Sequence, residues 1–127
     1  MIKFDIQSNI ISVINWVKRQ PNEVDKKTQE NLTKIGLIAS REAKRYAPFK
    51  SGALENSITY RVGQGYVSIE VPSNSRAGKY AYIRHENSYN YGAGTKIKGA
   101  QAGRLYIKRA IDDNWQKFKS IMENIYR

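Results

Sequence analysis

The chain contains one histidine, His85, which is followed directly by Glu86, and these two residue types together can transfer protons. The alternating residues 79–85 predict a β-strand around the histidine. Neighbouring side chains on a strand point to opposite faces, so on this interpretation the two groups do not share a pocket. We therefore expect His85 and Glu86 to fix the start of a long loop through polar contacts rather than to act in catalysis.

Other arrangements that could do chemistry are incomplete. The glycine-rich residues 92–96 lack the glycine–lysine–hydroxyl order of a P-loop, and as a dinucleotide fingerprint they place Ile97 where the third glycine should be. No serine lies in an elbow motif, and the absence of cysteine excludes a thiolate nucleophile and a cysteine-built zinc site. A hydrolase with paired carboxylates stays open, because spatial pairing cannot be read from a sequence. We predict a protein that is not an enzyme and that holds no metal and no cofactor.

Chain length and net charge limit the functions that are still possible. With 127 residues, the chain is expected to form one domain, residues 1–127. Its net charge of +11 favours contact with a polyanion such as nucleic acid, a membrane surface or an acidic protein. No segment approaches the ~20 apolar residues that span a bilayer, so we expect no membrane partner. The lack of cysteine is compatible with a reducing compartment such as the bacterial cytoplasm.

Hydrophobic spacing predicts the elements that must position these groups. Residues 1–20 are expected to form an N-terminal helical segment, since their isoleucines and valines recur at helical spacing. A long amphipathic helix is expected over residues 23–46, where apolar side chains repeat every three or four positions. Pro48 ends this helix, because the residue before a proline avoids the helical conformation.

The second half of the chain favours β-structure and then a helix. Residues 57–62 and 66–71 are rich in β-branched and aromatic side chains, and the glycines between them indicate a hairpin. An extended glycine-rich loop over residues 87–103 and a C-terminal helix over residues 104–126 follow. The predicted fold is α+β, with the long amphipathic helix and the C-terminal helix packed on a small antiparallel β-sheet.

Positive charge concentrates around the predicted loop. From Arg76 to Arg109 there are eight basic residues against the single acid Glu86, which leaves +7 of the chain's +11. Tyrosines are interleaved with them, as on surfaces that bind single-stranded nucleic acid. Tyrosine and arginine are also enriched at protein interfaces, which we favour because no nucleic-acid module signature is present. Lining a channel that passes duplex DNA would be a third use. The candidate interface residues are Arg76, Lys79, Arg84, His85, Tyr89, Tyr91, Lys96, Lys98 and Arg104.

Three short motifs occur in order along the chain. Residues 47–58 read Ala-Pro-Phe-Lys-Ser-Gly-Ala-Leu-Glu-Asn-Ser-Ile and follow the long helix, residues 80–87 begin Tyr-Ala and contain Glu86, and residues 103–111 pass from glycine into a hydrophobic helix start. Together they resemble the neck, tail-completion and minor capsid proteins of long-tailed bacteriophages. The motif residues expected to have a structural role are Ala47, Pro48, Ser51, Gly52, Leu54, Tyr80, Ala81 and Glu86.

The resemblance implies a structural virion protein of the phage neck, the head–tail junction. It would form a homo-oligomeric ring that joins the head-side connector to the tail, and it would assemble in the host bacterial cytoplasm. Its partners would be copies of itself, other phage connector and tail proteins, and duplex DNA passing through the ring. The alternative is a small basic nucleic-acid-binding protein that uses the tyrosine and arginine side chains of the strand and loop.

Overall fold

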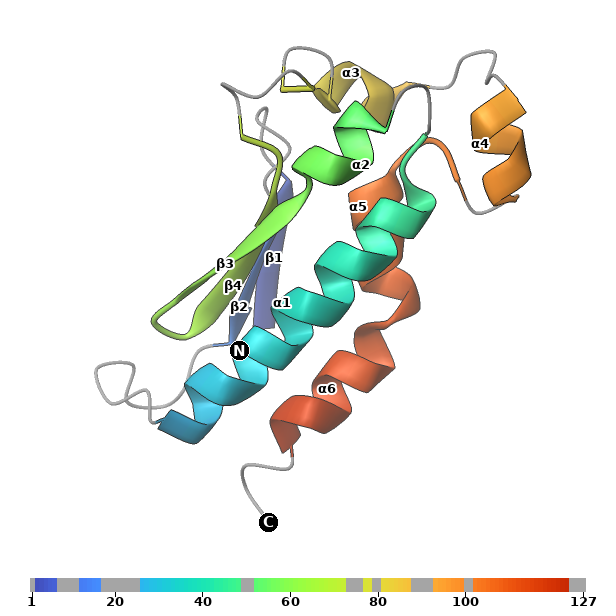
Figure 1. Cartoon of the computed structure of the whole chain (residues 1–127). Helices are drawn as coiled ribbons and strands as arrows, with labels where there is room; N and C mark the ends of the chain where they lie inside the picture. The colour runs from blue at the N-terminus through green and yellow to red at the C-terminus, as the bar shows by residue number, and fades with distance from the viewer. Residues whose placement is uncertain are drawn as a thin grey trace.

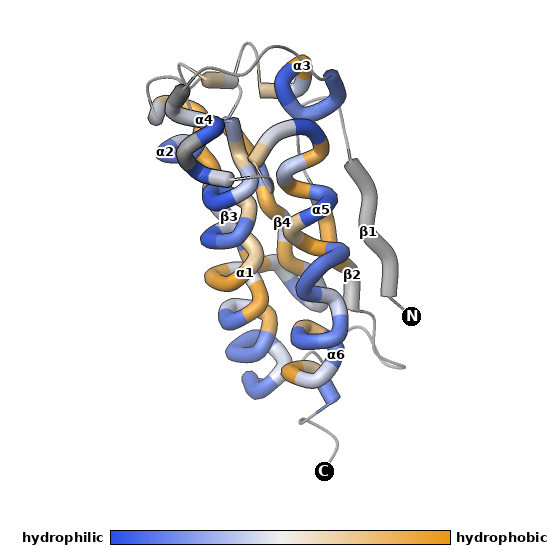
Figure 2. The backbone as a smooth tube through the Cα atoms, turned by 90° about the vertical axis from the view of Figure 1, so that its right-hand side faces the viewer, coloured by the Kyte–Doolittle hydropathy of each residue, from blue (hydrophilic) through white to orange (hydrophobic). Residues whose placement is uncertain are grey.

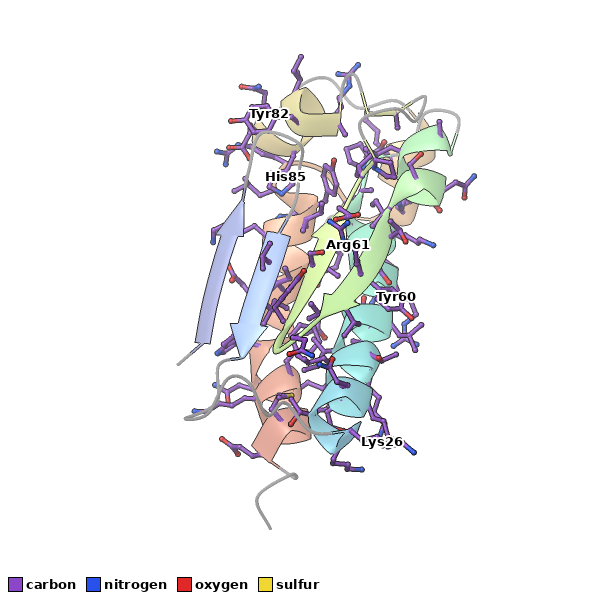
Figure 3. The ribbon with its side chains drawn as sticks, turned by 90° about the vertical axis from the view of Figure 1, so that its left-hand side faces the viewer. Lys26, Tyr60, Arg61, Tyr82 and His85 are labelled. Carbon is purple, nitrogen blue, oxygen red and sulfur yellow. The ribbon has the colours of Figure 1, made fainter. Side chains whose placement is uncertain are left out.

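The computed structural model describes residues 2–6, 12–16, 26–48, 52–72, 77–78, 81–87, 93–99 and 102–123. Within them the chain forms the predicted α+β fold, with helices packed on one face of a four-stranded antiparallel sheet (Figure 1). The sheet has the order β1-β2-β4-β3. Its strands are β1 Ile2–Ile6, β2 Ser12–Trp16, β3 Thr59–Gly63 and β4 Tyr66–Glu70. Figure 3 looks onto the other face of the sheet, with the long helices behind it.

The long helix α1, Lys26–Tyr46, confirms the long amphipathic helix that the sequence predicts and runs along the sheet (Figure 1). Its buried side packs on β3, β4 and the C-terminal helices. Gly36 leaves room for the side chains of the sheet, because a Cβ added there would be 2.5 Å from the Tyr60 ring. The buried residues of α1 are Thr28, Asn31, Leu32, Ile35, Gly36, Ala39, Ser40, Ala43 and Tyr46.

The chain reverses after α1 through the first motif. Pro48 is buried and follows the end of the helix, as predicted. Gly52 has φ 83°, in the left-handed region that glycine occupies without a steric cost. The short helix α2, Ala53–Ser57, begins directly after it. Leu54 and Ile58 then return to the core, where both are almost completely buried.

The predicted hairpin is confirmed by β3 and β4. The turn residue Gly65 has φ 78°, which favours glycine there. The register places Gly63 opposite Tyr66, and a Cβ at Gly63 would be 2.2 Å from the Tyr66 ring. The ring therefore covers the space that the missing side chain leaves next to the turn.

In the N-terminal segment, residues 2–6 and 12–16 form two paired strands, so the helix predicted within residues 1–20 is wrong. Strand β2 pairs with β4 and places Ile14 opposite Val67, and both side chains are fully buried. Without β2, strand β4 would expose a row of backbone groups along one edge. Pairing satisfies those groups, and this long-range contact overrides the local helical spacing.

Residues 81–86 form a short helix, α3 (Ala81–Glu86), so the third strand predicted over residues 79–85 is wrong. Ala81 and His85 are both buried and lie four residues apart, which is helical spacing. An apolar and polar alternation over so few residues also fits one and a half turns of a helix. The sequence pattern over these residues therefore does not distinguish a strand from a helix.

The segment predicted as an extended loop, residues 87–103, contains a helix, α4 (Ala93–Lys98), so that prediction is wrong for this part. A helix of one or two turns is not stable in isolation. Tertiary contacts must hold it, and Thr95 and Lys98 provide them from its inner side, where Thr95 is buried.

Two helices, α5 (Tyr106–Asp113) and α6 (Trp115–Glu123), replace the single helix predicted over residues 104–126. The break falls at Asn114, whose side-chain amide donates to the Ala110 carbonyl over 2.8 Å. Figure 2 shows α5 and α6 beside α1, and both helices contact it. Their buried residues are Tyr106, Ile107, Ala110, Ile111, Phe118 and Met122.

Candidate interaction surface

Helix α3 is joined to the first turn of α5 by the side chain of His85, which is fully buried. Its Nδ1 lies 2.5 Å from a carboxylate oxygen of Glu86, and its Nε2 lies 3.3 Å from the backbone nitrogen of Lys108. The ring also meets the ring of Tyr106 edge to face, at 4.9 Å between centroids. The expectation that His85 and Glu86 point to opposite faces is therefore wrong, because they lie on a helix and pair directly.

The His85 side chain caps the N-terminus of α5. The residue before this helix is Leu105, at φ 57°, and its side chain accepts no hydrogen bond. The first amides of a helix have no partner inside the helix. Because Nε2 accepts the N–H of Lys108, the neutral ring carries its proton on Nδ1 and donates it to Glu86. Burial lowers the pKa of His85 and so favours this neutral form, against the opposing effect of the Glu86 hydrogen bond.

Three further hydrogen bonds attach the backbone of α3 to the start of α5. The Ala81 carbonyl accepts the Tyr106 hydroxyl over 2.9 Å. The carbonyls of the last two residues of α3 accept the backbone N–H of Leu105 over 2.6 Å and Nε of Arg104 over 2.7 Å. Because bonds occur at both ends of this short helix, its orientation on the body is fixed.

The outer side of α3 carries two large apolar side chains that are open to solvent. Tyr82 is 42% exposed and Ile83 is 56% exposed. In Figure 3, Tyr82 lies at the end of the molecule and His85 lies on the side of α3 that faces the other helices. The hydrogen bonds to α5 therefore hold α3 in an orientation that presents this apolar pair to solvent.

The residues predicted to form an interface differ in their exposure to solvent. Lys96 and Arg104 are exposed and Arg84 is partly exposed, so these three can meet a partner. His85 is buried in the contact between α3 and α5, so its prediction as an interface residue is wrong. Four predicted residues lie outside the described part of the chain, namely Arg76, Lys79, Tyr89 and Tyr91.

Lys98, also predicted as an interface residue, caps helix α1 instead. Its ammonium group donates to the Lys44 carbonyl over 2.7 Å and to the Ala47 carbonyl over 2.6 Å. It also lies 2.9 Å from the carboxylate of Glu55 in α2. The last carbonyls of a helix lack partners within it and carry partial negative charge, so a cation is stabilising there. Lys98 thus ties α4 to α1 and α2.

The motif residues within the described part lie at positions that support the chain. Ala47 and Ala81 are buried with less than 2% exposure. Glu86 pairs with His85, and its backbone carbonyl holds Arg104. The remaining described ones are Pro48, Gly52 and Leu54, at the reversal after α1, whereas Ser51 and Tyr80 lie outside the described residues.

A second polar contact, between α1 and α5, was not predicted. The Tyr46 hydroxyl donates to Asp113 over 2.8 Å, and the Arg109 guanidinium lies over the Tyr46 ring at 5.4 Å. The hydrogen bond to Asp113 is the main cause that raises the pKa of Tyr46. The partners are far apart in the chain, and their local sequence carries no signal that would pair them.

Comparisons with known proteins find no matching protein family, curated protein or solved structure. In the described part of the chain, no group of three or more histidine, aspartate and glutamate residues is arranged to hold a metal ion. None of its helices is both long enough and apolar enough to cross a membrane.

Proposed function

We propose that this protein is a structural subunit of the neck of a long-tailed bacteriophage, where copies form a ring between the head-side connector and the tail. The three sequence motifs support the proposal through their resemblance to neck and tail-completion proteins. The observation that carries it is the exposed pair Tyr82 and Ile83 on the fixed helix α3.

A fixed apolar pair suits a subunit that must bind other subunits. Tyrosine is among the residues that contribute most to binding energy at interfaces. The hydrogen bonds between α3 and α5 order the helix before a partner arrives, so association costs less conformational entropy. In a ring, this surface of one subunit would contact a different surface of the next, and the contacts would close on themselves.

The positions of the motif residues are compatible with this role. Ala47, Ala81 and Leu54 are buried, and Gly52 makes the reversal after α1. Side chains at such positions hold the backbone that carries α3 and are not open to a ligand. In this proposal, the motif residues stabilise the backbone that holds α3 in place. The exposed residues between the motifs determine which partner binds.

Mass photometry of the purified chain, with a double variant Tyr82→Ser and Ile83→Ser, tests the assembly role. The unmodified chain is expected to form a ring-sized oligomer and the double variant to remain monomeric at the same concentration. Leu37→Ser is the matched control, because Leu37 is similarly exposed at 54% but lies on α1. Thermal unfolding of each variant verifies that the fold is retained.

Cryo-electron microscopy of phage particles that contain the protein tests the location. The proposal expects ring-shaped density of this fold at the head–tail junction. A chain that stays monomeric at all concentrations and is missing from virions would overturn it. Equal loss of assembly in the double variant and in the Leu37→Ser control would leave α3 without its assigned role.

The second candidate function is nucleic-acid binding by a small basic protein. The observation that favours it is a set of exposed cations on α1 that form no ion pair with a described residue, namely Lys27, Lys34, Arg41 and Lys44. The basic and tyrosine-rich segment predicted to bind nucleic acid gives this function less support, because Lys98 in that segment is bonded within the fold.

A further inference from the structure

One exposed side of α1 carries a line of basic side chains. Lys27, Lys34 and Arg41 follow one another at intervals of seven residues, and Lys44 lies one turn beyond. All four are exposed. Residues seven apart lie on the same side of a helix, so these four, here called the α1 stripe, face one direction. At about 1.5 Å per residue the stripe is roughly 25 Å long.

The four cations of the α1 stripe form no ion pair within the described part of the chain. None of its four cations lies within 4.0 Å of a described carboxylate. The acids are engaged elsewhere, since the partners are Glu42 with Arg45, Glu55 with Lys98, Glu70 with Arg61, Glu86 with His85, Asp112 with Lys108 and Asp113 with Tyr46. Glu30 is the one acid on the same exposed side of α1. The stripe is therefore a surface on which four cations outnumber the single carboxylate of Glu30.

A second copy of the chain is a poor partner for this surface. Each copy carries a net charge of +11, and most of its described carboxylates are already bonded. Two such surfaces repel each other unless an acidic patch faces the stripe. The complementary partner is thus a polyanion.

The composition of the stripe selects the kind of polyanion. Single-stranded nucleic acid is bound by aromatic side chains on which bases stack. The exposed side of α1 has no aromatic residue among its described positions, and Leu37 is its one exposed apolar side chain. Lysine and arginine side chains contact phosphate oxygens instead, and such contacts carry no sequence information. We infer that the α1 stripe binds the phosphate backbone of duplex DNA without reading its sequence.

The inference rests on the second candidate function, nucleic-acid binding, and not on the proposed neck function, because it concerns α1 and not α3. Its test uses a duplex of about 30 base pairs of random sequence and measures affinity by fluorescence anisotropy between 50 and 200 mM salt. Each neutralised phosphate contributes about −0.9 to the slope of log affinity against log salt. Four contacts therefore predict a loss of affinity of about 150-fold over this range.

Two triple variants of equal net charge separate the stripe from the general charge of the molecule. The stripe variant carries Lys27→Gln, Lys34→Gln and Lys44→Gln. The control carries Lys96→Gln, Lys117→Gln and Lys119→Gln, which are exposed on α4 and α6. With one contact left, the stripe variant is expected to lose only about 3- to 4-fold in affinity over the same salt range, whereas the control retains the steep dependence.

Three outcomes would overturn the inference. The first is that the unmodified chain does not bind the duplex at 50 mM salt. The second is an equal change of slope in both triple variants, which would indicate an effect of net charge alone. The third is tight binding of poly-glutamate without binding of the duplex, which would assign the stripe to an acidic protein. Loss of ring assembly in the α3 variant with unchanged DNA binding would keep the two proposals distinct.

Discussion

Replacement of Lys98 by methionine removes the charge that joins α4, α1 and α2 while keeping most of the side-chain volume. The ammonium group donates to two carbonyls at the end of α1 and lies beside Glu55. Its side chain is only 17% exposed, so water can replace these contacts only in part. Methionine cannot donate, and the carbonyl of the fully buried Ala47 would be left without this partner.

The expected loss of stability is that of one charged hydrogen bond that cannot be replaced, plus a smaller amount from two that can. A hydrogen bond to a charged group contributes about 1.5–3 kcal/mol. The Lys44 carbonyl and Glu55 are more accessible and can bind water after the substitution, so their contribution is small. We expect Lys98→Met to lower the free energy of unfolding by about 2–3 kcal/mol. For a chain of this size that corresponds to roughly 6–15 °C in Tm.

Urea unfolding followed by circular dichroism measures this loss, and two further variants interpret it. Lys96→Met lies on the same short helix but is exposed, so it should change stability by less than about 0.5 kcal/mol. Glu55→Gln keeps both carbonyl contacts of Lys98 and should lose less than about 1 kcal/mol, as is usual for a partly exposed ion pair. A Lys98→Met protein as stable as the Lys96→Met protein would refute the assignment of Lys98 as a cap.

Two other substitutions address His85 and Gly36. Because the folded chain holds the pKa of His85 below its ordinary 6.5, the unfolded chain takes up a proton first as the pH falls through that value. The stability advantage of the unmodified chain over His85→Gln should therefore be full above about pH 6.5 and shrink toward pH 5, and a difference that stays constant with pH would contradict it. Gly36→Ala should destabilise by about 1–3 kcal/mol despite the better helix propensity of alanine, since its Cβ would be 2.5 Å from the Tyr60 ring. Urea unfolding of Gly36→Ala in a Tyr60→Leu background is the check, where most of the loss should disappear.

The sequence predicts those parts of the fold that have a clear local pattern, either regular spacing over many residues or characteristic turn residues. Helix α1 has 21 residues with regular apolar spacing, and the β3–β4 hairpin is signalled by the glycines around its turn. By contrast, β2 is a strand because β4 lies beside it, and β4 is distant in the sequence. Helix α3 has only six residues, too few for its period to be distinguished from alternation.

In the candidate surface too, local sequence predicts some features, whereas others depend on long-range contacts. Composition locates the positive charge, but it cannot separate free cations from engaged ones. Lys96 and Lys98 lie on the same short helix, yet only Lys98 reaches the end of α1, through partners about fifty residues away in the chain. His85 was predicted to make polar contacts, but its role as a cap depends on Leu105 and Lys108, which approach it only in the folded state.

The position of β2 in the sheet has a consequence for the order in which the chain can fold on the ribosome. Strands β1 and β2 are made first and can pair with each other at once. A two-stranded hairpin is at best marginally stable alone, and Ile14 gains its buried neighbour only when Val67 has been synthesised after α1 and α2. The four-stranded sheet can therefore form only after the central hairpin has left the exit tunnel, although its first two strands are made much earlier.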